Sequence, residues 1–125
     1  MTINTHKDLD VWKTAMAAAM DILELTRALP PEERYSLSDQ VRRSSRSVAA
    51  NISEAWMKRQ YKGAFLLKLN DAVSEAAETQ TWLEIMQRCG YAPAEALTSL
   101  DAAYDRIIGQ LITMSRQADK WVRPS

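Results

Sequence analysis

Residues 37–57 have the sequence LSDQVRRSSRSVAANISEAWM, and the spacing of their side chains decides the fold. At 100° per residue, one set of small and apolar side chains falls within a wedge of about 80°. This set comprises Leu37, Val41, Ser44, Val48, Ile52 and Ala55. Arg42, Arg43 and Arg46 fall on the opposite side, and we call them the arginine face. Ser36 is the expected N-cap, with Asp39 in the place of a capping-box acid. The pattern predicts a helix with one buried and one basic face.

Three further segments have helical periodicity, at about residues 9–29, 61–89 and 93–121. Asp8 can cap the start of the first helix, and Pro30 and Pro31 are expected to end it. Gly90 is a suitable residue for the end of the third helix, and Pro93 for the first turn of the fourth. The predicted buried stripes are Trp12, Met16, Ala19, Leu23 and Thr26 in the first helix, Phe65, Leu69, Ala72, Ala76, Gln80, Leu83 and Gln87 in the third, and Leu97, Leu100, Tyr104, Ile108, Leu111 with Ser115 or Ala118 in the fourth.

The short breaks between these helices imply that consecutive helices are antiparallel neighbours. The chain of 125 residues has room for one domain, residues 1–125, and shows no linker or internal repeat. We therefore predict an all-α fold, an antiparallel up-down-up-down four-helix bundle.

The composition of the chain limits the kinds of surface and the cellular compartments that we expect for it. The 16 Lys and Arg balance the 16 Asp and Glu, so the net charge is zero, which argues against a surface that is basic all over. The single cysteine, Cys89, cannot form an internal disulfide, and we expect it to be a partly buried small side chain in a reducing compartment. The first ten residues lack an apolar signal core, and no stretch is apolar enough to span a membrane. We expect a cytoplasmic protein with no membrane partner.

The sequence offers little support for an enzymatic function. The only histidine, His6, precedes the first helix, and no Glu-x-x-His motif of the di-iron bundles occurs. No histidine is available as a base for the serines of residues 37–57, and no glycine-rich phosphate loop is present. Asp71, Glu75 and Glu78 lie off the predicted core stripe and suit a solvated or ion-paired face. We predict a protein that is not an enzyme, with no catalytic residues, no metal and no cofactor.

The charges are unevenly distributed along the chain. Between residues 42 and 68 there are seven cations and one acid, whereas residues 69–105 carry seven acids and one cation. The seven cations are Arg42, Arg43, Arg46, Lys58, Arg59, Lys62 and Lys68, and they are the candidate contacts to RNA or DNA.

In an up-down-up-down bundle, both termini and the loop between the second and third helices share one end. That basic end gathers Lys7, Lys58, Arg59, Lys62, Arg116, Lys120 and Arg123, and the acidic end gathers Glu32, Glu33, Glu84 and Glu95. Phosphates are therefore expected to bind at the basic end, with an affinity that falls steeply with salt.

A subunit interface is the alternative for the arginine face. Its arginines could pair with Asp71, Glu75 and Glu78 of a neighbouring copy, a contact between two different faces that closes into a ring. Trp56, Trp82 and Trp121 lie outside the main core stripes, which favours an oligomer over packing at the helix ends of one chain.

The sequence also resembles a known bacterial family of four-helix-bundle proteins. The family includes the proteins encoded in intervening sequences of 23S rRNA genes and the accessory variability determinant of diversity-generating retroelements. The resemblance is carried by DLDVWKTAM (8–16), the whole of residues 25–55 with the N-I-[AS]-E signature at 51–54, FLLKLNDAVSEAAETQ (65–80) and RCGY (88–91).

This resemblance implies a bundle that assembles into a homopentameric ring, without recognised catalytic residues. The retroelement members bind nucleic acid and a reverse transcriptase, so a reverse transcriptase is an expected partner only if this chain is of that type. Its neutral charge fits an intervening-sequence protein or an orphan relative better. The family positions matched here are Trp12, Gln40, Arg42, Arg43, Asn51, Ile52, Glu54, Glu75 and Gln80. Asn51 and Gln80 lie near the core face, where they are expected to fix the helix register through buried hydrogen bonds.

Overall fold

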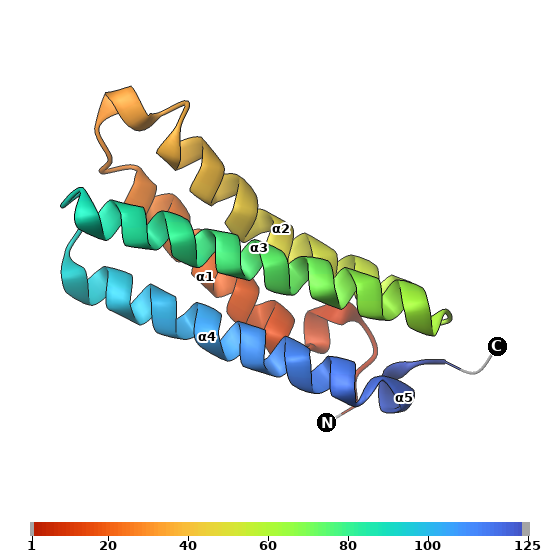
Figure 1. Cartoon of the computed structure of the whole chain (residues 1–125). Helices are drawn as coiled ribbons and strands as arrows, with labels where there is room; N and C mark the ends of the chain where they lie inside the picture. The colour runs from red at the N-terminus through yellow and green to blue at the C-terminus, as the bar shows by residue number, and fades with distance from the viewer. Residues whose placement is uncertain (1, 124–125) are drawn as a thin grey trace.

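The computed structural model describes residues 2–123 and consists of helices, with no strand in that range. Its elements are η1 (His6–Asp8), α1 (Asp10–Thr26), η2 (Pro31–Glu33), α2 (Leu37–Met57), α3 (Lys62–Arg88), α4 (Ala94–Arg116) and α5 (Ala118–Trp121). The four long helices lie side by side and alternate in direction (Figure 1). Because α2 packs on α1 and α3, while α4 packs on α3 and α1, the four helices close around a common core. None of the helices within residues 2–123 has both the length and the apolar character needed to cross a bilayer.

The helix ends differ from the predicted ones by more than one residue in two places. The fourth helix was expected to continue to residue 121, but Gln117 leaves the helical conformation, and α5 follows as a separate turn. The first helix ends at Thr26, because the next bonds are the tighter ones from Ala28 N–H to Leu25 and from Leu29 N–H to Thr26.

The predicted caps have mixed outcomes. Gly90 has a φ of 70° and ends α3 as predicted, with its own N–H bonded to Gln87 and that of Tyr91 bonded to Met86. The capping box at the start of α2 is wrong, because Ser36 makes no side-chain cap bond. Asp8 does not cap α1 either, since it closes a capping box with Thr5 around η1.

The core confirms the stripe of α2 in full, and it corrects those of α3 and α4 by one residue in places. Thr79 and Met86 are buried where Gln80 and Gln87 were expected, and Ile107 is buried where Ile108 was expected. Of the two alternatives given for the end of the fourth stripe, Ala118 is buried and Ser115 is not, and Met114 is buried as well. The buried positions of α3 are therefore 65, 69, 72, 76, 79, 83 and 86, alternately four and three apart. That spacing averages 3.5 residues and keeps one seam facing the neighbouring helices in a supercoiled bundle, whereas a straight helix drifts away from it.

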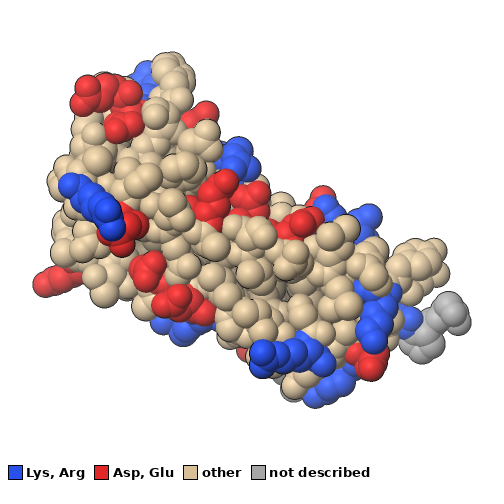
Figure 2. Space-filling view, viewed as in Figure 1, with Lys and Arg blue, Asp and Glu red and all other residues tan. Residues whose placement is uncertain are grey.

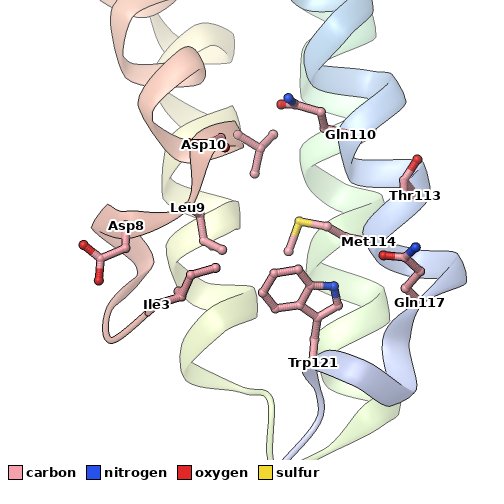
Figure 3. A pocket seen from close by; sticks show the side chains of 10 residues that line it. Ile3, Asp8, Leu9, Asp10, Gln110, Thr113, Met114, Gln117 and Trp121 are labelled. Atoms are coloured by element: carbon pink, nitrogen blue, oxygen red, sulfur yellow. The ribbon is translucent and has the colours of Figure 1, made fainter. Parts of the chain in front are cut away.

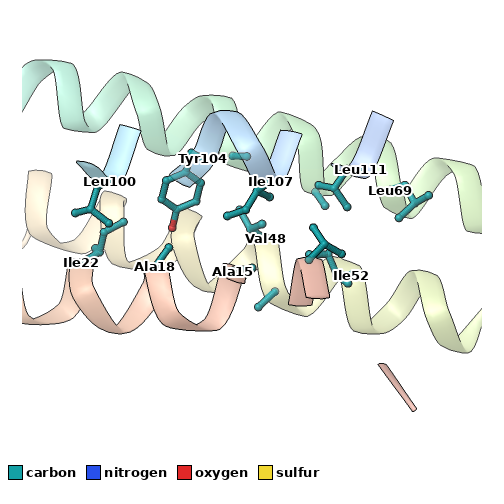
Figure 4. Packing of buried hydrophobic residues seen from close by; sticks show 14 of the residues in the cluster. Ala15, Ala18, Ile22, Val48, Ile52, Leu69, Leu100, Tyr104, Ile107 and Leu111 are labelled. Atoms are coloured by element: carbon teal, nitrogen blue, oxygen red, sulfur yellow. The ribbon is translucent and has the colours of Figure 1, made fainter. Parts of the chain in front are cut away.

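The stripe of α1 was placed one residue too far along the chain. Its buried residues are Val11, Ala15, Ala18, Ile22 and the correctly predicted Thr26. The small side chains of Ala15 and Ala18 leave room for Tyr104 of α4, which points toward Ala18 (Figure 4). The predicted residues Trp12, Met16, Ala19 and Leu23 instead line a surface groove beside α2. Because α1 is apolar on two adjacent stripes, periodicity alone could not say which one faces the core.

Candidate nucleic-acid interface

The seven predicted cations fall into two groups on the structure. Lys58, Arg59 and Lys62 lie at the turn between α2 and α3, whereas the arginine face and Lys68 lie along the bodies of these helices. The two groups differ in how many of their charges are already paired within the chain.

The arginine face is largely engaged inside the molecule. The guanidinium of Arg43 pairs with Glu78 and, at 3.6 Å, with Glu75. Arg42 is half-buried and donates from Nε to Thr26 Oγ1 over 2.7 Å, which ties α2 to α1. Arg46 remains exposed and forms no ion pair with another residue of the range 2–123.

Lys68 is neutralised in the same way. Its Nζ lies 3.1 Å from Glu54 and 3.9 Å from Asp71, so α3 is held against α2 by a second ion pair. The acids that the interface alternative assigned to a neighbouring copy, Asp71, Glu75 and Glu78, thus find cations in their own chain. The arginine face is therefore a poor candidate for phosphate contacts, apart from Arg46.

The basic end is formed as the topology predicted. The N-terminal segment before α1, the short helix α5 and the turn between α2 and α3 lie together at one end of the bundle, and the other two connections lie at the opposite end (Figure 1). Figure 2 shows Lys and Arg side chains gathered at the first of these ends. Its cations come from segments that are distant in the sequence: Lys7 from η1, Lys58 from the turn, Arg116 from the last residue of α4, and Lys120 from α5.

An aromatic cluster holds the turn and α5 together. Trp56 is buried at the end of α2, and its ring meets that of Trp121 edge to face at a centroid distance of 6.2 Å. The guanidinium of Arg59 stacks 3.5 Å over the ring of Trp56. The carbonyl of Arg59 accepts a 3.0 Å hydrogen bond from the N–H of Arg123. The prediction that Trp56 faces another subunit is wrong, because it packs at the helix ends of its own chain.

Arg59 keeps its positive charge within this cluster. Burial, and then the nearby charge of Arg123, lower the pKa of Arg59 from its usual value. An arginine keeps its proton under such shifts, because its unperturbed pKa lies far above neutral pH. Lys62, at the first turn of α3, pairs with Asp119 of α5 at 2.9 Å, a link between exposed side chains.

The acidic end is closed by polar bonds instead. The hydroxyl of Tyr91 donates to Glu33 Oε2 over 2.8 Å, which joins the connection after α3 to the one after α1. This hydrogen bond, then burial and the charge of Glu33, raise the pKa of Tyr91 to about 12.

Cys89, expected to be partly buried, is exposed, because it lies at the very end of α3, beyond the last core position.

The residues matched to the family motif have structural contacts. Trp12 Nε1 donates to Ser53 Oγ over 3.1 Å and links α1 to α2. Gln80 Nε2 donates to Asp105 Oδ1 over 2.8 Å and links α3 to α4, but this bond is exposed and not buried as expected. Asn51 does not serve this purpose, because its Nδ2 donates to Ser47 of its own helix.

A hollow of about 450 Å³ lies between the N-terminal segment and α4, beside the basic end (Figure 3). Its apolar lining includes Leu9, Met114 and Trp121. Asp8 points away from it, because its carboxylate accepts hydrogen bonds from the N–H groups of Asn4 and Thr5. These bonds lower the pKa of Asp8.

Among residues 2–123, no three histidine, cysteine or acidic side chains are grouped to hold a metal ion.

Tyr61 was not among the contacts predicted for the basic end. This residue lies between Arg59 and Lys62 and is 64% exposed. The signal was present in the sequence, since an aromatic residue inside a basic turn is a pattern typical of single-strand binding surfaces.

The chain is similar to known proteins both in sequence and in structure. It matches the family described as 23S rRNA-intervening sequence protein over residues 7–113. A crystal structure from Bacteroides thetaiotaomicron, of a protein with unknown function from the S23 ribosomal protein family, superposes with a TM-score of 0.78. That protein is 34% identical, and the match covers 85% of this chain and 95% of the other. No curated protein matches the chain.

Proposed function

The chain belongs to the 23S rRNA-intervening sequence protein family, and on that premise we propose that it is a non-enzymatic, ring-forming bundle that binds RNA or DNA through its basic end. The family resemblance stated from the sequence is thereby confirmed. The observation that carries the proposal is the contrast between paired and free cations.

Five cations of the basic end are exposed and form no ion pair with any other described residue: Lys7, Lys58, Arg116, Lys120 and Arg123. They come from elements that are distant in sequence and adjacent in space, so they present a concentrated positive field. Phosphate groups release counterions when they meet such cations, which makes binding favourable at low salt and weak at high salt. A net charge of zero is compatible with this arrangement, because most of the acids lie away from this end, although Asp119 of α5 lies within it.

Ring formation is supported by the groove between α1 and α2. Met16 and Met20 line it and are 39% and 55% exposed, although they lie beside Trp12. An exposed apolar strip of this kind is typical of a surface that another protein covers. We propose that the neighbouring copy in a homopentamer covers it, and sedimentation of the wild-type chain tests this. A monomer at micromolar concentration would contradict the ring.

The nucleic-acid proposal is tested with a charge-matched pair of variants. The first combines Lys58→Ala, Arg116→Ala and Lys120→Ala at the basic end. The control combines Arg27→Ala, Arg34→Ala and Arg88→Ala, three exposed cations toward the acidic end. Both lose the same charge, so a difference between them reports position and not net charge.

We expect a mixed-sequence single-stranded RNA to bind the wild type and the control in 50 mM salt, and the basic-end variant much more weakly. Each lost phosphate contact lowers the slope of log affinity against log salt by about 0.7 for a single strand, so three lower it by about 2. Equal affinities and slopes for the two variants would exclude the basic end. No binding by the wild type would favour the alternative function, a protein-interaction scaffold.

A further inference from the structure

We propose that Tyr61 is a stacking platform for an unpaired base, so that the basic end takes single-stranded nucleic acid in preference to duplex. The inference rests on the proposed function and names the class of nucleic acid that the same end would bind. It is carried by the exposure of the ring, the rigidity of its backbone and the cations on either side.

The backbone of Tyr61 is well fixed. Its N–H donates to the carbonyl of Lys58 over 3.0 Å, and its own carbonyl accepts the N–H of Phe65 over 2.9 Å. Phe65 is fully buried in the core, so the first turn of α3 is anchored. An aromatic ring on such a turn loses little conformational freedom when a base stacks on it, which favours binding.

The ring itself is available. Tyr61 is 64% exposed, and its side chain has no hydrogen-bond or aromatic partner among residues 2–123. The position two residues further on is Gly63, and a Cβ built there would meet nothing within 4 Å. The surface beside the turn is therefore open to a flat ligand.

The charges around the ring match the backbone of a nucleic acid. Lys58 and Lys62 flank Tyr61 in the sequence and are both exposed; Lys58 forms no ion pair with another described residue, whereas Lys62 pairs with Asp119 at the surface. Surfaces that bind single strands combine cations for the phosphates with aromatic rings for the bases. A duplex keeps its base faces stacked inside, so it can use the cations of this surface and not the ring.

A second exposed tyrosine supplies the contrast. Tyr35 is 86% exposed, but Glu32 and Glu33 lie shortly before it, and the one cation beside it, Arg34, already lies over its ring at 6.0 Å. Exposure alone would make both tyrosines equal candidates. The neighbouring charges favour Tyr61 and make Tyr35 its matched control.

The experiment measures the affinity of Tyr61→Leu, Tyr61→Phe and Tyr35→Leu for three ligands: a 12-nucleotide RNA of mixed sequence, the same strand paired in a duplex, and a 12-unit abasic strand with the same phosphates. We expect Tyr61→Leu to bind the RNA at least about fivefold more weakly, because stacking on one base has roughly that worth. Its affinity for the abasic strand and the duplex should be unchanged. Tyr61→Phe keeps the ring and should bind like the wild type, as should Tyr35→Leu.

The outcomes separate this inference from the function on which it rests. If the wild type binds the abasic strand as tightly as the RNA, the basic end binds phosphates and the stacking platform is wrong. If none of the strands binds at low salt, the proposed function fails as well. If Tyr61→Leu changes the sedimentation of the protein and not its RNA affinity, Tyr61 is a subunit contact, which also overturns the inference.

Discussion

The two ends of the bundle are closed by different kinds of interaction. At the basic end, Trp56, Trp121 and Arg59 form a stack that holds the end of α2, the following turn and α5. At the acidic end, the connections between the helices are held by the glycine cap at Gly90 and by the hydrogen bond from Tyr91 to Glu33. One end is held by apolar surface, and the other by backbone conformation and a polar bond.

The reason lies in the connections that each end must secure. The basic end carries α5, which is a separate turn after the break at Gln117 and too short to be stable alone. Trp121 gives this turn an apolar anchor, and repulsion among the surrounding cations opposes it. The acidic end needs only to turn the chain from one long helix to the next, and caps suffice for that. The ends should therefore respond differently to mutation and to pH.

Removal of Trp56 should have the largest effect on this comparison. Trp56→Ala deletes a buried indole and the surface on which Trp121 and Arg59 stack. We expect a loss of about 3 kcal/mol in the free energy of unfolding, as for other buried aromatic residues cut to alanine. Urea denaturation measures it, and Tyr35→Ala is the control, because an exposed side chain at the acidic end should change stability by less than about 0.5 kcal/mol. A loss for Trp56→Ala as small as that of the control would show that the stack does not hold the basic end.

Substitution of the cap glycine should have an intermediate effect. Gly90→Ala forces a side chain into a φ of 70°, and we expect a cost of about 1–2 kcal/mol. No atom lies within 4 Å of the added Cβ, so the cost is conformational and not steric. The matched change at the basic end, Gly63→Ala, lies inside α3 and should be neutral or stabilising by up to about 1 kcal/mol. Thermal unfolding of both variants tests the pair, and equal effects would contradict the role of the cap.

The smallest effect concerns pH and is confined to the acidic end. The pKa of Tyr91 is raised from 10.0 in the unfolded chain to about 12 in the folded one, so its hydrogen bond adds stability below pH 10 that is lost as the pH rises toward 12. Tyr91→Phe should unfold at a lower temperature than the wild type at pH 8, and the difference should vanish by about pH 12. Thermal melts across this range measure it. A constant difference would mean that the hydroxyl does not titrate in this way.

Much of the architecture follows from periodicity, since α2 has one apolar face and every residue predicted for it is buried. The remaining errors have physical causes. In α1, the apolar stripe through Val11 and the one through Trp12 are equivalent in sequence, and only packing against α4 decides between them. In α3, a polar Gln80 was placed inside because a strict 100° step was followed, whereas the helix keeps the seam through Thr79.

The candidate site was predictable in its location and less so in its members. The topology alone brings Lys58 and Lys120 to one end. Whether a cation is free, however, depends on which acid the fold places beside it. Arg43 and Lys68 are distant in sequence from Glu75 and Glu54, so their pairing with these acids required the three-dimensional arrangement.

The seam of α3, with its alternation of four and three residues, has a consequence for how the length of this protein can vary. Inserting or deleting one residue in the middle of α3 would turn everything beyond it by about 100° and carry the next core residues to the surface. An insertion of seven residues restores the seam and lengthens the bundle by two turns, provided that the partner helices lengthen too. Among relatives of this fold, length differences should therefore collect in the connections and at the chain ends, and those inside helices should come in sevens.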